Sequence, residues 1–163
     1  KLISFIEGGE QERGCRAGTE SVHNIAGLNQ AFNDAYNNLE DRIEKIKSLK
    51  NYFIKTLGDK INFKINGDVG QSSDTILNLQ LPVNIEKKPV LNFKMDIAGI
   101  ACSAGSACQS GSDKPSHVLS EILDKKEINN ISLRFSFSHY NTTKDIDYAI
   151  EFLESFVIEN QGL

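Results

Sequence analysis

The chain has 163 residues, of which 39% are hydrophobic, and this is enough to bury a core and argues against a disordered tail. Its formal net charge is −4, and lysines and arginines do not cluster among aromatic residues, so a nucleic-acid-binding surface is not expected. No apolar run is long enough to cross a membrane, so we do not expect a membrane as a partner either.

The chain begins at Lys1 without an initiator methionine, and an apolar stretch is already under way in residues 2–6. We therefore expect the true N-terminus elsewhere and interpret the chain as a C-terminal fragment. Its length is most simply that of one domain with an appended segment. The three cysteines have no repeating spacing and do not make a disulfide framework, so we expect a reducing compartment, the cytoplasm.

Residues 10–20 combine glycines, two arginines and Thr19, and they lie directly before an amphipathic stretch. Glycines allow close backbone approach and a helix start attracts anions, so the segment has the parts of a phosphate-binding site. The simpler alternative is that Thr19 caps the following helix and that Arg13 and Arg16 are solvated.

Residues 19–56 are predicted to form one long amphipathic helix of about 55 Å. Apolar residues recur there at steps of three and four, which places them in one stripe on the helix surface. The stripe consists of Ile25, Leu28, Phe32, Tyr36, Leu39, Ile43, Ile46, Leu49 and Phe53. Gly27 is the position at which such a helix could bend.

Two short strands are predicted after this helix. Residues 61–65 alternate between apolar and polar side chains and end at an Asn-Gly-Asp turn signal over residues 66–68. The second strand is predicted over residues 74–81 and ends at Pro82, which has no backbone N–H. One face of that strand carries Thr75, Leu77, Leu79 and Leu81.

Residues 89–97 alternate as a strand would, although the pattern alone does not exclude a helix. The following residues, 101–112, place Cys108 among small, polar and flexible neighbours with no helical or strand period. A long irregular loop in a compact domain is more often functional than accidental, so Cys108 is predicted to be a nucleophile. A loop cysteine without a task is the alternative, and Cys102 is expected to be an inert thiol on the strand before the loop.

Residues 131–137 form the clearest predicted strand, with Ile131, Leu133, Phe135 and Phe137 on one face. Arg134 lies among serines on the other face, where its guanidinium could hold a carboxylate through two parallel hydrogen bonds. A solvated or salt-bridged arginine is the simpler alternative. Thr142 and Asp145 then form a capping-box signature that begins a terminal amphipathic helix.

Three of these motifs together resemble the cysteine desulfurases of the NifS/IscS type, which are pyridoxal-phosphate-dependent enzymes of the class V aminotransferase family. The loop around Cys108 is similar to the family's Ser-Gly-Ser-Ala-Cys sequence. Residues 8–20 resemble its Gly-Gly-Gln-Glu-Arg-Gly and Arg-Ser-Gly-Thr-Glu-Asn signature, and residues 132–136 resemble the strand whose arginine holds the substrate carboxylate. The motifs follow one another in the family's order.

The resemblance implies a role for one residue in each motif. Cys108 would take sulfur from the substrate L-cysteine as a persulfide and leave L-alanine, while Arg134 would hold the substrate carboxylate. Thr19 would bind the phosphate of pyridoxal 5′-phosphate in the neighbouring subunit, which requires a homodimer. The sulfur would pass to an acceptor protein such as an iron–sulfur scaffold, or serve thio-cofactor and tRNA biosynthesis.

The chain departs from the family pattern in three places. Glu10 interrupts what is usually a run of glycines, and Ser21 replaces the common asparagine. Where the family often has Gly-Arg after the third strand, this chain has Ser138 and His139. The changes at Glu10 and Ser21 remove no group to which a role is assigned, whereas any contact from the family's second arginine is lost or optional here.

The resemblance further implies an α+β fold, the small C-terminal domain of the aspartate-aminotransferase fold, with a few-stranded sheet packed by helices. Residues 1–18 would be the tail of the large cofactor-binding domain, and residues 19–163 the small domain. It also implies a helix over residues 89–97. No lysine lies in the Ser-x-His-Lys context of the family's Schiff base, so the chain alone is predicted to be inactive.

Two other classes of function remain open. The chain could be a cofactor-independent sulfur-carrier or redox module that cycles Cys108, or a non-catalytic partner-binding domain whose long helix is the interface. A zinc site is not expected, because the chain has no Cys-x-x-Cys pair and its histidines, His23, His117 and His139, have no zinc-finger spacing.

Overall fold

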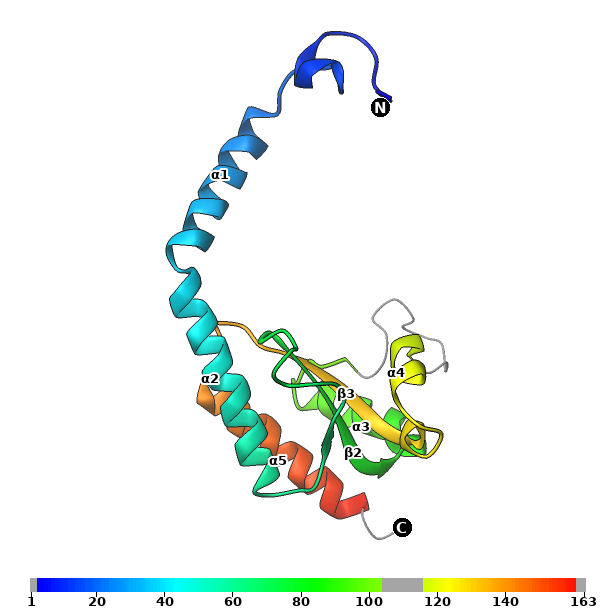
Figure 1. Cartoon of the computed structure of the whole chain (residues 1–163). Helices are drawn as coiled ribbons and strands as arrows, with labels where there is room; N and C mark the ends of the chain where they lie inside the picture. The colour runs from blue at the N-terminus through cyan, green and yellow to red at the C-terminus, as the bar shows by residue number, and fades with distance from the viewer. Residues whose placement is uncertain (1–2, 104–115, 161–163) are drawn as a thin grey trace. The chain divides into compact units, whose positions relative to one another are not determined.

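The computed structural model describes residues 3–103 and 116–160 (Figure 1). The chain divides into two compact units, Lys1–Glu40 and Asp41–Leu163. This division follows the packing of the chain, and the predicted domain boundary at residue 18 stays a prediction.

The first unit contains the short 3-10 helix η1 (Gln11–Gly14) and helix α1 (Val22–Asn37). Helix α1 begins three residues later than the sequence predicts, and its N-cap is Ser21. Thr19 is therefore not the capping residue. Within η1, Glu12 and Arg13 have positive φ angles of 50° and 55°, so this turn is held in the sparsely populated left-handed region.

The long predicted helix is interrupted at Asn38, where α1 ends and α2 (Leu39–Gly58) begins. Gly27, the expected position of a bend, lies inside α1. The Asn38 Nδ2 donates to the Asp34 carbonyl at 2.9 Å, and the backbone at Asn38 leaves the helical region at ψ 15°. Asparagine side chains compete in this way for helix carbonyls, which explains the break.

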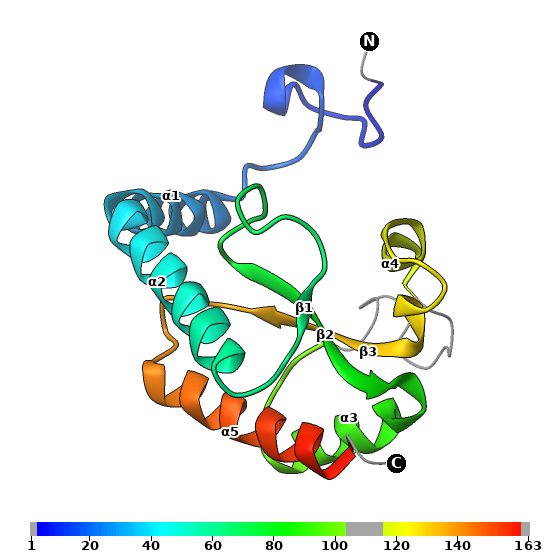
Figure 2. The ribbon, with the colours of Figure 1, turned by 60° about the horizontal axis from the view of Figure 1, so that its bottom comes forward.

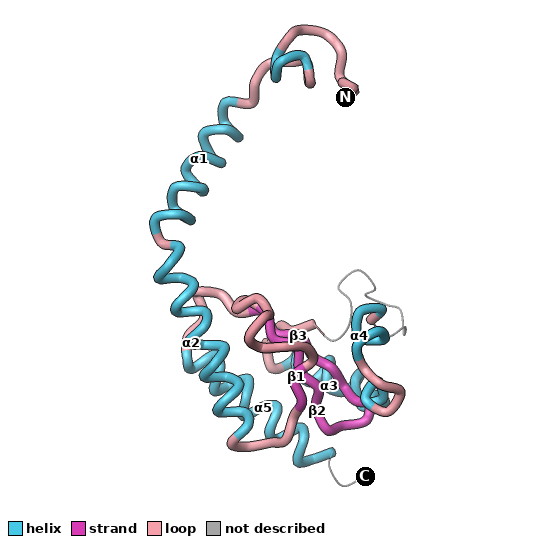
Figure 3. The backbone as a smooth tube through the Cα atoms, in the orientation of Figure 1, coloured by secondary structure: helices cyan, strands magenta, loops and turns pink. Residues whose placement is uncertain are grey.

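The second unit is built on a three-stranded antiparallel sheet in the order β1-β2-β3, coloured magenta in Figure 3. The strands are β1 (Lys64–Ile65), β2 (Ile76–Asn84) and β3 (Asn130–Ser136). Strand β1 is shorter than predicted, because the Ile61 N–H donates to the Leu57 carbonyl at the end of α2 instead of to a strand. The predicted turn after it is present, with Gly67 at φ +102°.

Strand β2 continues past Pro82, where the sequence predicts its end. The register between β2 and β3 shifts between Gln80 and Asn84, and Pro82 is exposed within that irregular stretch. A proline needs no ladder partner at such a bulge, so the strand accommodates it.

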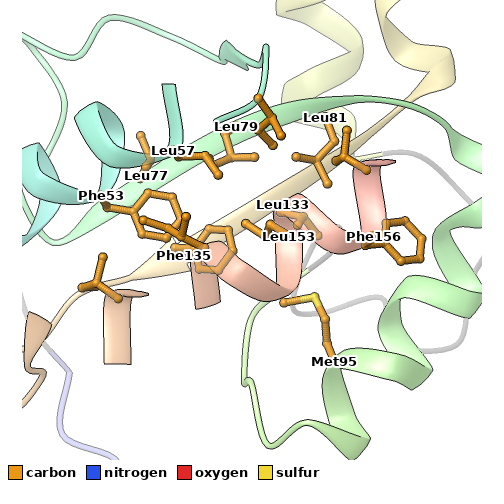
Figure 4. Close-up of a cluster of buried hydrophobic side chains, with 14 of the residues drawn as sticks. Phe53, Leu57, Leu77, Leu79, Leu81, Met95, Leu133, Phe135, Leu153 and Phe156 are labelled. Carbon is orange, nitrogen blue, oxygen red and sulfur yellow. The ribbon is translucent and has the colours of Figure 1, made fainter. Parts of the chain in front are cut away.

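One face of the sheet is covered by α2, α3 (Lys88–Ile97) and α5 (Thr143–Asn160), as Figure 2 shows. The core between them takes alternate residues of the strands and one stripe of each helix (Figure 4). Its side chains include Phe53, Leu57, Leu77, Leu79, Leu81, Met95, Leu133, Phe135, Leu153 and Phe156. The predicted α+β fold is therefore confirmed.

Two predictions about the helices of this unit are also confirmed. The stretch over residues 89–97 is helix α3, which has a proline in its first turn and buries Leu91 and Met95, four residues apart. Thr142 and Asp145 form the capping box of α5: the Thr142 N–H donates to Asp145 Oδ2 at 2.8 Å, and the Asp145 N–H donates to Thr142 Oγ1 at 3.4 Å.

Candidate functional site

Arg134 lies in the middle of β3, between the buried side chains of Leu133 and Phe135. Successive side chains of a strand point to opposite faces, so Arg134 lies on the face of the sheet opposite the core. The residue is partly buried, and Asn78 of β2 is its cross-strand partner. The predicted strand and its polar face are thus confirmed.

Ser103 pairs with Arg134 at the edge of β3 that β2 does not occupy. The Ser103 N–H donates to the Arg134 carbonyl at 3.1 Å, and the Arg134 N–H donates to the Ser103 carbonyl at 2.7 Å, which forms an isolated antiparallel bridge. The Arg134 Nη2 also donates to Ser103 Oγ at 3.3 Å. Three hydrogen bonds therefore join Ser103 to Arg134, and sequence analysis did not predict this pairing.

The Arg134 guanidinium forms no ion pair with any residue of the ranges 3–103 and 116–160. A guanidinium has five N–H donors, and one of them is directed to Ser103. The remaining donors suffice for a bidentate pair with a carboxylate. Among the described residues, the salt-bridged alternative for Arg134 is thus not observed.

A neutral hydrogen-bonded group lies on the same face of the sheet. Asn66 Nδ2 donates to Asn78 Oδ1 at 2.9 Å and to Ser132 Oγ at 3.1 Å. The buried Asn66 Oδ1 has no hydrogen-bond partner within the described part of the chain. These side chains carry no charge, so they do not neutralise the positive charge of Arg134, and that charge can attract an anion.

Cys108 lies outside the described residues, so its place relative to Arg134 stays a prediction. The described residue nearest to it in the sequence on its N-terminal side is Ser103, which pairs with Arg134. The short helix α4 (His117–Ile122) follows in the next described range.

Cys102 is partly buried against the core, with its Sγ 3.6 Å from the Met95 Sδ. Burial raises the pKa of the Cys102 thiol to about 11, so the nucleophilic thiolate is disfavoured. The prediction of a packed thiol is confirmed, and its inertness stays a prediction. The backbone there is irregular, however, with only the single bridge at Ser103 instead of a strand.

In the first unit, Thr19 is exposed, and its hydroxyl makes no hydrogen bond with another described residue. The nearby Arg16 is already engaged: Nη1 donates to the Gly18 carbonyl at 3.0 Å, and Nη2 pairs with Glu20 Oε2 at 3.2 Å. The charge of Arg16 is therefore compensated within its own turn. The arrangement fits a hydrogen bond from the Thr19 hydroxyl to a phosphate. It does not fit a phosphate contact from Arg16, because that side chain is engaged with Gly18 and Glu20.

A cavity of about 380 Å³ lies in the second unit, and the sequence analysis did not predict it. Its lining residues include the apolar Phe53, Phe135 and Ile146 as well as Gly99 and Tyr148. The Tyr148 hydroxyl donates to the Ala98 carbonyl at 3.0 Å, which ties α5 to the segment that leads to Ser103.

The histidines take no part in a described site. His23 and His117 are exposed, and the His139 ring packs on Tyr140 with centroids 3.9 Å apart. Among the described residues, no three His, Cys, Asp or Glu side chains lie close enough together to hold a metal ion. None of the helices in the described ranges combines the length and apolarity needed to cross a bilayer.

The family model described as aminotransferase class-V matches residues 4–149. The chain is 39% identical over 160 residues to a protein of Bacillus subtilis named putative cysteine desulfurase IscS 1, covering 96% of this chain and 41% of that protein. It is 34% identical over 157 residues to the cysteine desulfurase IscS of Klebsiella pneumoniae, covering 96% of this chain and 38% of that protein.

Among solved structures, the chain resembles a NifS-like protein from Rickettsia africae with a TM-score of 0.72 and 28% identity, over 98% of this chain and 41% of that one. A second structure, titled NifS-like protein, has the same fold at a TM-score of 0.73 and 24% identity, over 96% of this chain and 39% of that one. The chain thus spans about two fifths of the length of these relatives.

Proposed function

The chain belongs to the class V aminotransferase family, and from this premise we propose that the whole protein is a pyridoxal-phosphate-dependent cysteine desulfurase. It would convert L-cysteine to L-alanine and transfer the sulfur to Cys108. The relatives that share most of this chain's length are named cysteine desulfurases, which supports the proposal.

The observation that carries the proposal is the state of Arg134. Its guanidinium is partly buried, is oriented by Ser103, and is paired with no carboxylate in the described ranges. A partly buried cation without a partner attracts an anion, and the planar fork of arginine matches a carboxylate. Arg134 would therefore bind and orient the α-carboxylate of the amino-acid substrate.

Cys108 would carry the sulfur. Its thiolate would attack the substrate sulfur, a new S–S bond would form, and the substrate Cβ–S bond would break with its electron pair left on carbon. Protonation of that carbon gives L-alanine, and Cys108 holds the sulfur as a persulfide, so no further oxidant or reductant is needed. Bound pyridoxal phosphate would supply the electron sink that makes the substrate reactive.

Thr19 would donate its exposed hydroxyl to the phosphate of the cofactor in the neighbouring subunit of a homodimer. The lysine that binds the cofactor covalently would come from outside these 163 residues, because no lysine of the chain lies in the expected Ser-x-His-Lys context. We accordingly expect the isolated chain to release no alanine, and the physiological acceptor to be a sulfur-accepting protein such as an iron–sulfur scaffold.

The test is mass spectrometry of the whole protein after incubation with pyridoxal phosphate and L-cysteine. We expect an added sulfur atom on wild type and on Cys102→Ala, and none on Cys108→Ala. Cys102 is the matched control, because it lies six positions away and its thiol is packed. No added sulfur on the cofactor-loaded wild type would overturn the proposal.

Arg134 separates a desulfurase from a sulfur-carrier module. Arg134→Ala is expected to raise the KM for L-cysteine strongly, because the carboxylate loses its charged partner. If sulfur appeared on Cys108 equally fast in this variant, the transfer would not depend on a carboxylate held by Arg134, and the result would favour the sulfur-carrier function over the one proposed.

A further inference from the structure

Arg134 is held in place from both edges of its strand. On one side β2 pairs with β3 at Asn78, and on the other side Ser103 exchanges two backbone hydrogen bonds with Arg134, at 3.1 and 2.7 Å. Pairing on both sides fixes the backbone of Arg134, although it leaves the several side-chain torsions of the arginine undetermined. A substrate carboxylate binds in a defined orientation only if the Arg134 guanidinium is fixed as well.

The described contact that fixes the guanidinium is the hydroxyl of Ser103. Arg134 Nη2 donates to Ser103 Oγ at 3.3 Å, and no carboxylate of the described ranges competes for the group. One N–H of Nη2 is used in this contact. The second N–H of Nη2, together with an N–H of a neighbouring nitrogen, forms an edge that can bind both oxygens of a carboxylate.

We propose that Ser103 is a positioning residue for substrate recognition: its hydroxyl orients the Arg134 guanidinium so that the free edge receives the α-carboxylate of the amino acid. The inference rests on the proposed function, and it adds Ser103 as the residue that acts through Arg134. A hydroxyl suits this task because it accepts a hydrogen bond without neutralising the charge that the substrate needs, as an aspartate would.

The first experiment is steady-state kinetics of the whole protein with pyridoxal phosphate and L-cysteine. Ser103→Ala keeps the backbone bridge and removes the acceptor. We expect the KM to rise about tenfold with kcat nearly unchanged, the size expected for one hydrogen bond to a charged group. Ser103→Thr keeps a hydroxyl on an extended backbone and should restore most of the wild-type KM.

Ser132→Ala is the matched control, because Ser132 lies on the same face of β3 and its hydroxyl accepts from Asn66, at 3.1 Å, instead of from Arg134. It should leave the KM near the wild-type value. An unchanged KM in Ser103→Ala, or an equal rise in Ser132→Ala, would overturn the inference.

A second measurement does not depend on turnover. The affinities of the cofactor-loaded protein for L-alanine and for L-alaninamide, which has no carboxylate, are compared by calorimetry. We expect Ser103→Ala to weaken the binding of L-alanine by the same factor as the KM and to leave that of L-alaninamide unchanged. Equal weakening of both ligands would indicate a general structural role and would overturn the inference.

The two measurements also separate the inference from the function on which it rests. A wild-type protein without desulfurase activity, but with Ser103-dependent binding of L-alanine, would overturn the proposed reaction and support the role of Ser103. A wild-type protein that binds L-alanine no better than L-alaninamide would overturn the carboxylate site itself.

Discussion

The same apolar stripe runs along α1 and α2, but its two halves have different surroundings. In α1, Leu28, Phe32 and Tyr36 are 69%, 58% and 66% exposed, whereas in α2, Leu49 and Phe53 are 4% and 1% exposed. The spacing of apolar residues is equally regular in both halves. A helical period therefore determines which side chains share a face, and it does not determine whether that face is covered.

The buried half has partners from distant parts of the chain. Phe53 packs against Phe135 at a ring-centroid distance of 5.0 Å (Figure 4). It also packs against Phe137 at a ring-centroid distance of 5.8 Å. At the surface of α2, the Tyr52 hydroxyl donates to Asp147 of α5 at 2.7 Å, and just after α2 ends, Lys60 pairs with Glu154 of α5. In α1 the aromatic contact is local, between Phe32 and Tyr36 four residues apart.

The largest effect that sharpens this comparison is expected from truncating one phenylalanine in each half. Phe53→Ala should lower the free energy of unfolding of the 163-residue chain by about 3–5 kcal/mol, because it leaves a cavity between α2 and the sheet. Phe32→Ala should change it by less than about 0.5 kcal/mol, since its ring is mainly exposed. Urea denaturation followed by circular dichroism measures both, and similar values for the two variants would contradict the contrast.

A smaller effect is expected from the lysines of α2. Lys50 is 2% exposed, and its Nζ donates to Ser72 Oγ and to the Ser73 carbonyl, each at 2.9 Å. Lys50→Met should cost about 1.5 kcal/mol through loss of these charge-assisted bonds. The exposed Lys47, changed to Met, should cost less than about 0.5 kcal/mol. The same urea denaturation experiment measures both variants. An unchanged free energy of unfolding in Lys50→Met would mean that removing a buried charge offsets the lost hydrogen bonds.

The smallest effect is expected at the helix starts of the two units. Thr142→Ala removes the acceptor of the Asp145 N–H and should cost about 1 kcal/mol. Ser21→Ala at the start of α1 should have little effect, because the Ser21 side chain makes no capping hydrogen bond. Comparable losses in both variants would show that α1 is capped in solution by a contact that the structure does not contain.

Local patterns predicted much of the fold. The alternation of Leu133, Arg134 and Phe135 correctly predicted β3 and its two faces, and Thr142 correctly predicted the start of α5. The predictions failed where a distant or competing partner decided the outcome. Strand β2 continues past Pro82 because the register shifts at that point, and the long helix breaks at Asn38 because a side chain competes for a helix carbonyl.

The sequence by itself determined the approximate positions of β2, β3 and α5, the apolar face of each, and the motifs around Thr19, Cys108 and Arg134, because these depend on residue type and on spacing along the chain. Only the tertiary structure decided that the stripe is buried from Ile46 onward and exposed before it, and that Ser103 meets Arg134. Such contacts join residues far apart in the sequence, here 31 positions, and no local period encodes which of them meet.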